Sequence, residues 1–319
     1  GRIFTFGASA DGLESLMTPM TSPEWLKGQY IVWCPAIAYD ILMSGGTYKQ
    51  KTVEDWLHGI TMPDPDVVND NIQTVHENEA HTPFWRVIEL DDDYYAKIKW
   101  PSAFWAGWYD LFSVGTLEAW EGFNTKSDPS VRYTSKIIVD PLGHCLEGAE
   151  FFLPNSVMGR TALVLAQAYE TFGIYDPKRE EIGMIKNVTY YVMSSDDEAG
   201  TSAGQYWTSL EKFPEYIPTS YYFSGDGTAS TNSPTSSTPA STTYKYDPSN
   251  PIPTLGGNNL PASIGGSIPC GPLDQQSIDS RSDMVVFNVA KSDSEITMTG
   301  PLFAELYVSS DMIDTDFMV

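Results

Sequence analysis

Short apolar segments alternate with amphipathic segments along the first part of the chain. The apolar segments lie at 3–6, 102–109, 136–139 and 188–193, and the segments with helical spacing lie at 11–17, 111–123 and 156–172. Strands that alternate with helices are typical of a parallel sheet covered by helices on both faces. We therefore expect an α/β domain in which the carboxyl ends of the strands meet at one edge.

A long insertion separates the first two of these predicted strands. Residues 36–95 are rich in Asp, Asn and Glu, with helical patterns at 53–57 and 67–76. An insertion of this size between two strands of a parallel sheet is most simply a helical cap over the carboxyl edge. We expect this cap to determine which molecules reach that edge.

The pattern changes again after the last predicted strand of the sheet. Residues 224–243 are rich in Ser, Thr, Pro and Gly, which is typical of an exposed loop. Short β-type segments follow at 284–289, 295–299 and 302–309, and they predict the start of an all-β sandwich or jelly roll. The expected domains are a body at 1–35 and 96–213, the cap at 36–95 and a jelly-roll domain at 214–319.

The composition is that of a folded, strongly acidic protein. Of the 319 residues, 41% are hydrophobic and 13% are aromatic, which excludes disorder of the whole chain. The net charge of −24 repels phosphate backbones, so we expect no nucleic-acid partner and regard solubility as the simplest role of this charge. The longest apolar stretch, 30–43, is too short to span a bilayer, so we expect no membrane partner.

One serine has the surroundings of a catalytic nucleophile. The segment Gly7-Ala8-Ser9-Ala10-Asp11-Gly12 follows a predicted strand and opens a predicted helix. A nucleophile elbow requires this context, with small neighbours because strand and helix approach closely there. The spacing is G-x-S-x-x-G rather than the commoner G-x-S-x-G, and a turn or cap serine is the alternative interpretation. Ser9 is therefore a candidate nucleophile.

Two further residues complete a catalytic triad with Ser9. Asp110 stands where the predicted strand 102–109 ends, and His144 follows the predicted strand 136–139. In a parallel sheet these strand ends share one edge with the elbow, and an acid that orients a histidine base is the requirement of an activated serine. Alone, Asp110 could cap the next helix and His144 could be an ordinary loop histidine. Together, in the order Ser, Asp, His, they predict a triad.

The sequence does not predict a metal site. His76 and His81 are five residues apart, so they would not share one face of a helix as a zinc motif requires. The cysteines Cys34, Cys145 and Cys270 have no CxxC spacing, which argues against a zinc site and against a disulfide framework.

The triad segments resemble a known family, the cocaine esterase and X-Pro dipeptidyl-peptidase group of α/β-hydrolases. The segments that carry the resemblance are 1–12 around Ser9, Ala106-Gly107-Trp108-Tyr109-Asp110, Ile137 through Pro141-Leu142-Gly143-His144, and in the β part 246–257, 271–275 and 308–317. The family implies an α/β-hydrolase body, an inserted helical cap and a C-terminal jelly roll. It also implies transfer of an acyl group to water through a serine acyl-enzyme, with no cofactor and no metal.

The resemblance also implies roles for residues near the triad. The backbone N–H of Ala10 would donate to the oxyanion, although the family usually has tyrosine at this position. Phe112 aligns with an aromatic residue that lines the acyl pocket, and we include Trp108 among the expected substrate-binding residues. The family's histidine loop usually has tryptophan where this chain has Leu142.

Several alternatives stay open on the sequence alone. The expected partner is a small-molecule ester or amide substrate, and assembly into a homo-oligomer stays open. Within enzymes the alternatives are an X-Pro dipeptidyl-peptidase and an α-amino acid ester hydrolase or acylase. A non-catalytic binding module is the alternative from another class. Because both ends of the sequence lie inside strand-like patterns, we expect a piece of the family's chain that is inactive and poorly folded when made alone.

Overall fold

The computed structural model describes residues 3–21, 23–60, 64–146, 186–194, 204–235, 237 and 241–319. The helix expected at 156–172 lies outside these residues. The chain packs as two compact units, one formed by Gly1–Lys212 with Gly256–Leu273 and the other by Phe213–Leu255 with Asp274–Val319. The domain boundaries expected from the sequence stay a prediction, but packing assigns 256–273 to the first unit.

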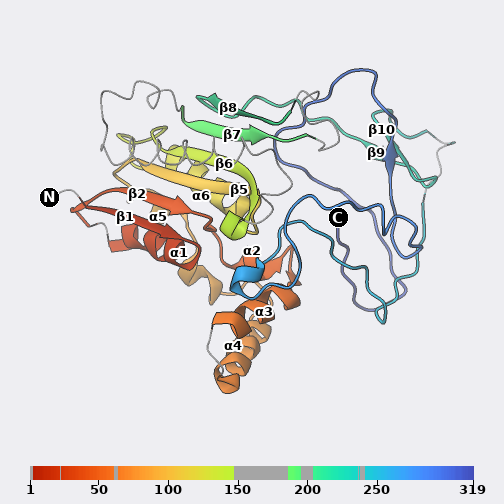
Figure 1. Ribbon diagram of the computed structural model, residues 1–319, viewed down its shortest axis with the longest axis horizontal. Helices are drawn as coiled ribbons and strands as arrows, with labels where there is room; N and C mark the ends of the chain where they lie inside the picture. Colours follow the sequence, from red (N-terminus) through yellow and green to blue (C-terminus); the bar gives the residue numbers. More distant parts are fainter. Residues whose placement is uncertain are drawn as a thin grey trace. The chain divides into compact units, whose positions relative to one another are not determined.

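The first unit is built on a six-stranded mixed sheet (Figure 1). Its strands, in their order across the sheet, are β1 (Ile3–Ala8), β2 (Leu26–Val32), β5 (Ser102–Tyr109), β6 (Lys136–Gly143), β7 (Val188–Val192) and β8 (Tyr206–Leu210). Neighbouring strands are parallel except β8, which runs antiparallel to β7. Helix α1 (Ala10–Met17) packs on β1 and β2, and α6 (Ser113–Thr125) packs on β5 and β6. The α/β class expected from the sequence is confirmed.

The sequence pattern predicted 102–109 as the strand that directly follows 3–6, but β2 lies between them. The expected order of strands is therefore wrong. The polar side chain of Gln29 interrupts the apolar pattern of β2, yet it is fully buried. Its Nε2 donates to the carbonyl oxygen of Ser15 at 2.5 Å, and its Oε1 accepts from the indole of Trp100 at 3.1 Å. Burial of a paired amide costs little, so tertiary partners make the strand possible.

The centre of the sheet supplies most of the apolar core. Ile31, Phe104, Phe123, Ile137 and Ile138 are fully buried, each on β2, β5, β6 or α6. The rings of Phe104 and Phe123 meet edge to face with centroids 5.0 Å apart, which joins α6 to β5. Burial of one such side chain stabilises the fold by about 1.5–3 kcal/mol. This rigid layer carries the strand ends discussed below.

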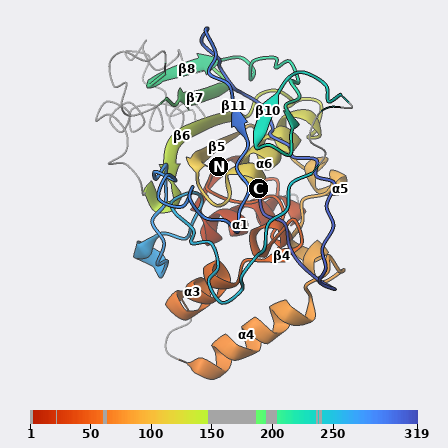
Figure 2. The ribbon, with the colours of Figure 1, turned by 90° about the vertical axis from the view of Figure 1, so that its right-hand side faces the viewer.

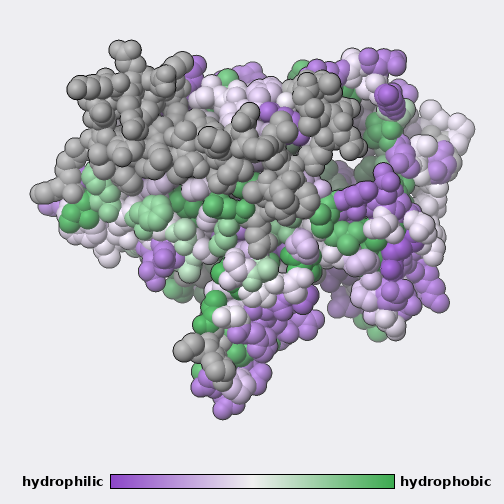
Figure 3. All heavy atoms as spheres, viewed as in Figure 1, coloured by the Kyte–Doolittle hydropathy of each residue, from purple (hydrophilic) through white to green (hydrophobic). Residues whose placement is uncertain are grey.

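The insertion between β2 and β5 is mainly helical. Its elements are α2 (Tyr39–Leu42), the hairpin β3 (Met43–Ser44) and β4 (Thr47–Tyr48), α3 (Gln50–Ile60), α4 (Pro65–Glu77), the short 3-10 turn Trp85–Ile88 and α5 (Asp92–Tyr95). Val53 and Leu57 of α3 pack against Val68 of α4. Both views show α3 and α4 projecting below the sheet (Figures 1 and 2). In Figure 3 hydrophilic side chains gather on one side of this projection.

The second unit contains a small sheet of β9 (Tyr222–Phe223), β10 (Thr228–Ser230) and β11 (Asn288–Val289). Strand β10 lies inside the stretch expected to be an exposed loop. The expected strand at 284–289 is reduced to β11, and the structure has no strand at 295–299 or 302–309. A strand needs a neighbour for its backbone hydrogen bonds, and exposed side chains such as Leu302 and Tyr307 show that these segments have none within the described residues.

Candidate active site

Ser9 lies between a strand and a helix in a strained backbone conformation. Strand β1 ends at Ala8 and α1 begins at Ala10, and Ser9 between them has φ 57° and ψ −123°. A non-glycine residue in this region costs about 1–3 kcal/mol and is typical of functional sites. The N–H of Ser9 donates to the carbonyl oxygen of Val32 at 2.9 Å, which anchors the turn to the end of β2. The turn therefore holds the serine at the carboxyl edge of the sheet.

The three residues proposed as a triad form one chain of hydrogen bonds. The Nε2 of His144 lies 3.0 Å from the Oγ of Ser9, and its Nδ1 lies 2.7 Å from the Oδ2 of Asp110. His144 is 1% exposed and Asp110 is 0% exposed. In a neutral imidazole whose Nδ1–H donates to the carboxylate, Nε2 is left to accept the proton of the serine hydroxyl. This arrangement matches that of an activated nucleophile.

Asp110 is held from several sides at the end of β5. Its Oδ1 accepts from the N–H of Phe112 at 2.6 Å, and its carbonyl oxygen accepts from the N–H of Ser113 at 3.0 Å. Both oxygens of the carboxyl group therefore accept hydrogen bonds, which suits an ionised carboxylate. Burial, and after it the charge of Asp110, raises the pKa of the nearby Cys34 thiol.

A second buried carboxylate shapes the turn that carries His144. Strand β6 continues to Gly143, four residues beyond the expected 136–139. The Oδ1 of Asp140 accepts from the N–H of Leu142 at 2.9 Å, and its Oδ2 accepts from the indole of Trp105 at 2.8 Å. Leu142, at the position where the family usually has tryptophan, packs against Tyr191 in the core. After His144 the backbone enters the left-handed region at Cys145, with φ 53°.

Two aromatic rings flank the imidazole of His144. The ring centroid of Phe112 lies 5.0 Å away and that of Trp33 lies 5.6 Å away, and both rings meet it edge to face. Trp33 was not recognised in the sequence. It directly follows β2, is 8% exposed, has φ 47°, and its buried Nε1 has no hydrogen-bond partner among the described residues. Recognition of β2 would have pointed to it, since residues at this edge of the sheet approach the triad.

The remaining expected site residues lie in different surroundings. Ala10 is the first residue of α1, so its N–H has no acceptor within the helix, and a role in the oxyanion hole stays a prediction. The indole of Trp108 donates to the carbonyl oxygen of Tyr191 at 2.9 Å, and its ring contacts Tyr190. The partners of Trp108 thus lie on β7, and its role in substrate binding also stays a prediction.

In the part of the chain that the structure describes, no group of three or more His, Cys, Asp or Glu could hold a metal ion, and no helix is long and apolar enough to cross a membrane. His76 contacts Glu79 and His81 contacts Glu89, so the two histidines have separate partners.

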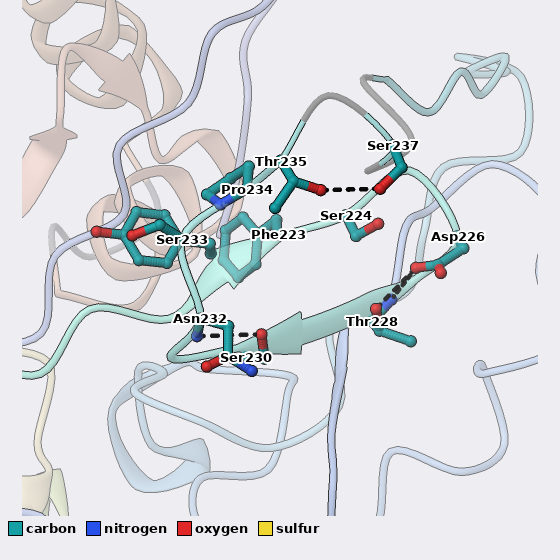
Figure 4. A pocket seen from close by; sticks show the side chains of 11 residues that line it. Phe223, Ser224, Asp226, Thr228, Ser230, Asn232, Ser233, Pro234, Thr235 and Ser237 are labelled. Atoms are coloured by element: carbon teal, nitrogen blue, oxygen red, sulfur yellow. Dashed lines mark hydrogen bonds between the residues drawn. The ribbon is translucent and has the colours of Figure 1, made fainter.

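The second unit has a cavity of about 300 Å³ (Figure 4), lined by Tyr222, Phe223, Ser224, Asp226, Thr228, Ser230, Asn232, Ser233, Pro234, Thr235 and Ser237. Its lining residues include no histidine, lysine or cysteine.

Comparisons with known proteins point to one group of hydrolases. Residues 185–319 match the X-Pro dipeptidyl-peptidase C-terminal non-catalytic domain. The chain is 27% identical over 260 residues to the cocaine esterase of Rhodococcus sp. (strain MB1 Bresler), a match that covers 77% of this chain and 42% of that protein. The chain therefore spans less than half the length of this relative.

Solved structures show the same fold. A CocE/NonD family hydrolase from Staphylococcus aureus aligns with a TM-score of 0.52 at 17% identity, over 73% of this chain and 38% of that one. An α-amino acid ester hydrolase aligns with a TM-score of 0.57 at 14% identity, over 91% of this chain and 52% of that one. These matches confirm the expected resemblance and the α/β-hydrolase fold, followed by a β-rich C-terminal domain.

Proposed function

We propose that this chain, a homologue of cocaine esterase with the fold of the CocE/NonD hydrolases, belongs to a serine hydrolase that cleaves an ester or amide bond through an acyl-serine intermediate. The observation that carries the proposal is the continuous hydrogen bonding from Ser9 through His144 to Asp110. The strained backbone of Ser9 supports it, because such strain is retained where function requires it.

In the first half of the reaction, the hydroxyl of Ser9 attacks the carbonyl carbon of the substrate. The Nε2 of His144 takes the hydroxyl proton as the new C–O bond forms, and Asp110 stabilises the resulting imidazolium without accepting the proton. The tetrahedral intermediate then collapses. The bond to the leaving group breaks, and His144 returns its proton to the departing alcohol or amine.

In the second half, water replaces the leaving group. His144 takes a proton from the water molecule as its oxygen attacks the acyl-enzyme, and a second tetrahedral intermediate forms. The collapse of this intermediate releases the carboxylic acid and returns the proton to Ser9, so the enzyme is restored.

Negative charge develops on the carbonyl oxygen in both intermediates. The N–H of Ala10 is the proposed donor, because it opens α1 directly after the nucleophile and benefits from the positive end of the helix dipole. Loss of one oxyanion donor typically costs about 3 kcal/mol in the barrier. Phe112, against the imidazole, is the proposed wall of the acyl pocket, and the helical insertion 36–95 is the proposed determinant of substrate choice.

The test is labelling and turnover in the full protein that carries this chain. A fluorophosphonate probe should label Ser9, and Ser9→Ala should abolish labelling and lower kcat by about 10⁶-fold. Ser130→Ala is the matched control and should leave both unchanged, since Ser130 is exposed and its hydroxyl donates to Asp128 in its own loop. A full protein that is never labelled and hydrolyses no ester or amide would instead be a non-catalytic binding module.

A substrate panel separates the alternatives within the enzyme class. Comparison of p-nitrophenyl esters, X-Pro p-nitroanilides and α-amino acid esters distinguishes an esterase, a dipeptidyl-peptidase and an α-amino acid ester hydrolase. We expect the esters to be cleaved fastest, because the sequence match to a cocaine esterase covers most of this chain.

A further inference from the structure

One loop of the chain is remote in sequence from the triad but lies beside it. This loop, residues 256–273, is called the strap below. It falls inside the region that matches a non-catalytic domain, yet it packs with the first unit, which carries the triad. The strap includes the short 3-10 turn Ala262–Ile264.

The strap is closed at its base and holds its own shape. Gly257 and Gly271 exchange two backbone hydrogen bonds of 2.7 and 3.0 Å, and both have positive φ, which favours glycine. Inside the loop, Nδ2 of Asn259 donates to the carbonyl oxygens of Gly256 and Pro269. A compact loop with joined ends is a frequent carrier of function.

The base of the strap touches both turns that carry triad residues. The Nδ2 of Asn258 donates to the carbonyl oxygen of Asp110 at 3.1 Å. A Cβ atom on Gly143, the residue before His144, would lie only 2.7 Å from the Cβ of Cys270. The strap therefore packs directly on the acid turn and on the histidine turn.

The far end of the strap contacts the helical insertion. The hydroxyl of Ser267 donates to Oδ2 of Asp55 on α3 at 3.0 Å. A Cβ atom on Gly59 of the same helix would lie 2.9 Å from the carbonyl oxygen of Ile264. One closed loop thus joins α3 to the turn at the end of β5.

We propose that Asn258 is a positioning residue for the acid of the triad, an inference that rests on the proposed function. The carbonyl oxygen of Asp110 accepts from Ser113 within its own turn and from Asn258 across it. A carbonyl oxygen has two lone pairs, so the second donor fixes the direction of this peptide group. The carboxylate of Asp110 follows that direction, and through it so does the imidazole of His144.

The experiment compares two strap variants in the full protein. Asn258→Ala should lower kcat by about 10- to 100-fold with KM nearly unchanged, since small misplacement of a catalytic group has effects of this size. It should also shift or broaden the downfield proton resonance of His144 Nδ1–H. Ser267→Ala removes the side-chain hydrogen bond that joins the strap to α3 and should leave kcat and the resonance as in the parent.

A second variant separates positioning from folding. Asn258→Asp has nearly the same size but no N–H to donate, so it should lose at least as much kcat as Asn258→Ala. Parent-like kcat and resonance in both Asn258 variants would overturn the proposal. Equal losses of kcat and melting temperature in Asn258→Ala and Ser267→Ala would also overturn it, because the strap would then act only on stability. Failure of the proposed function is separate, since Ser9→Ala would then retain turnover.

Discussion

Gly7 and Asp11 lie so close that a Cβ atom on Gly7 would be 2.1 Å from the carbonyl oxygen of Asp11. The two residues flank the turn of Ser9, one on β1 and the other on α1. No side chain fits between them, so the backbone conformation of Ser9 depends on glycine at position 7.

The change Gly7→Ala should therefore disrupt the elbow. Because the new methyl group meets backbone atoms, α1 must move. We expect the protein to lose about 1–3 kcal/mol of stability and most of its activity. Thermal melting and kcat measure the two effects. Gly46→Ala, where φ is 88° and no atom lies within 4 Å, is the control: it should lower stability by roughly 1–2 kcal/mol with kcat retained.

The change Asp110→Asn should lower kcat by about 10⁴-fold with the fold intact. An amide can donate to Nδ1 of His144, which favours the tautomer that cannot accept the proton of Ser9. Steady-state kinetics and circular dichroism of the same sample test this. A loss below tenfold would mean that another carboxylate orients the histidine. The sequence suggests Glu147 and Glu150, which lie outside the described residues.

The pair Trp33→Phe and Trp33→Ala tests the ring beside His144. The phenyl ring keeps an aromatic contact and removes an indole N–H that has no partner among the described residues, so Trp33→Phe should stay close to the parent in melting temperature and kcat. Trp33→Ala leaves a cavity and should cost about 3–5 kcal/mol in stability. If Trp33→Phe lost as much kcat as Trp33→Ala, the indole nitrogen itself would be required.

The change Gln29→Leu should destabilise the sheet although it makes β2 more apolar. It leaves the indole N–H of Trp100 and the carbonyl oxygen of Ser15 buried without their present partner, at a cost of about 1–3 kcal/mol each. Urea denaturation followed by tryptophan fluorescence measures the difference. Lys27→Leu, on the exposed side of the same strand, is the control and should stay within about 0.5 kcal/mol of the parent.

Strand β5 and the turn of Ser9 could be predicted from local sequence. The apolar run 102–109 has the observed bounds of β5, and the small residues around Ser9 match the close approach of β1 and α1. The hydrogen bonds of Asp110 and His144 agree with the predicted triad geometry, although their catalytic roles stay a prediction. Patterns of this kind are readable because apolar runs and steric limits act between neighbours in the chain.

Tertiary structure alone decided the features whose partners are distant in sequence. Strand β2 was missed because Gln29 looks unsuited to a core until Ser15 and Trp100 supply its hydrogen bonds. Asn258 bonds to the carbonyl oxygen of Asp110, 148 positions away, and nothing local in the sequence marks that contact. Conversely, 302–309 has the alternation of a strand but no neighbour to pair with among the described residues. A buried polar group or a strand is stable only when its hydrogen-bond partner is present, and that partner is set by the fold.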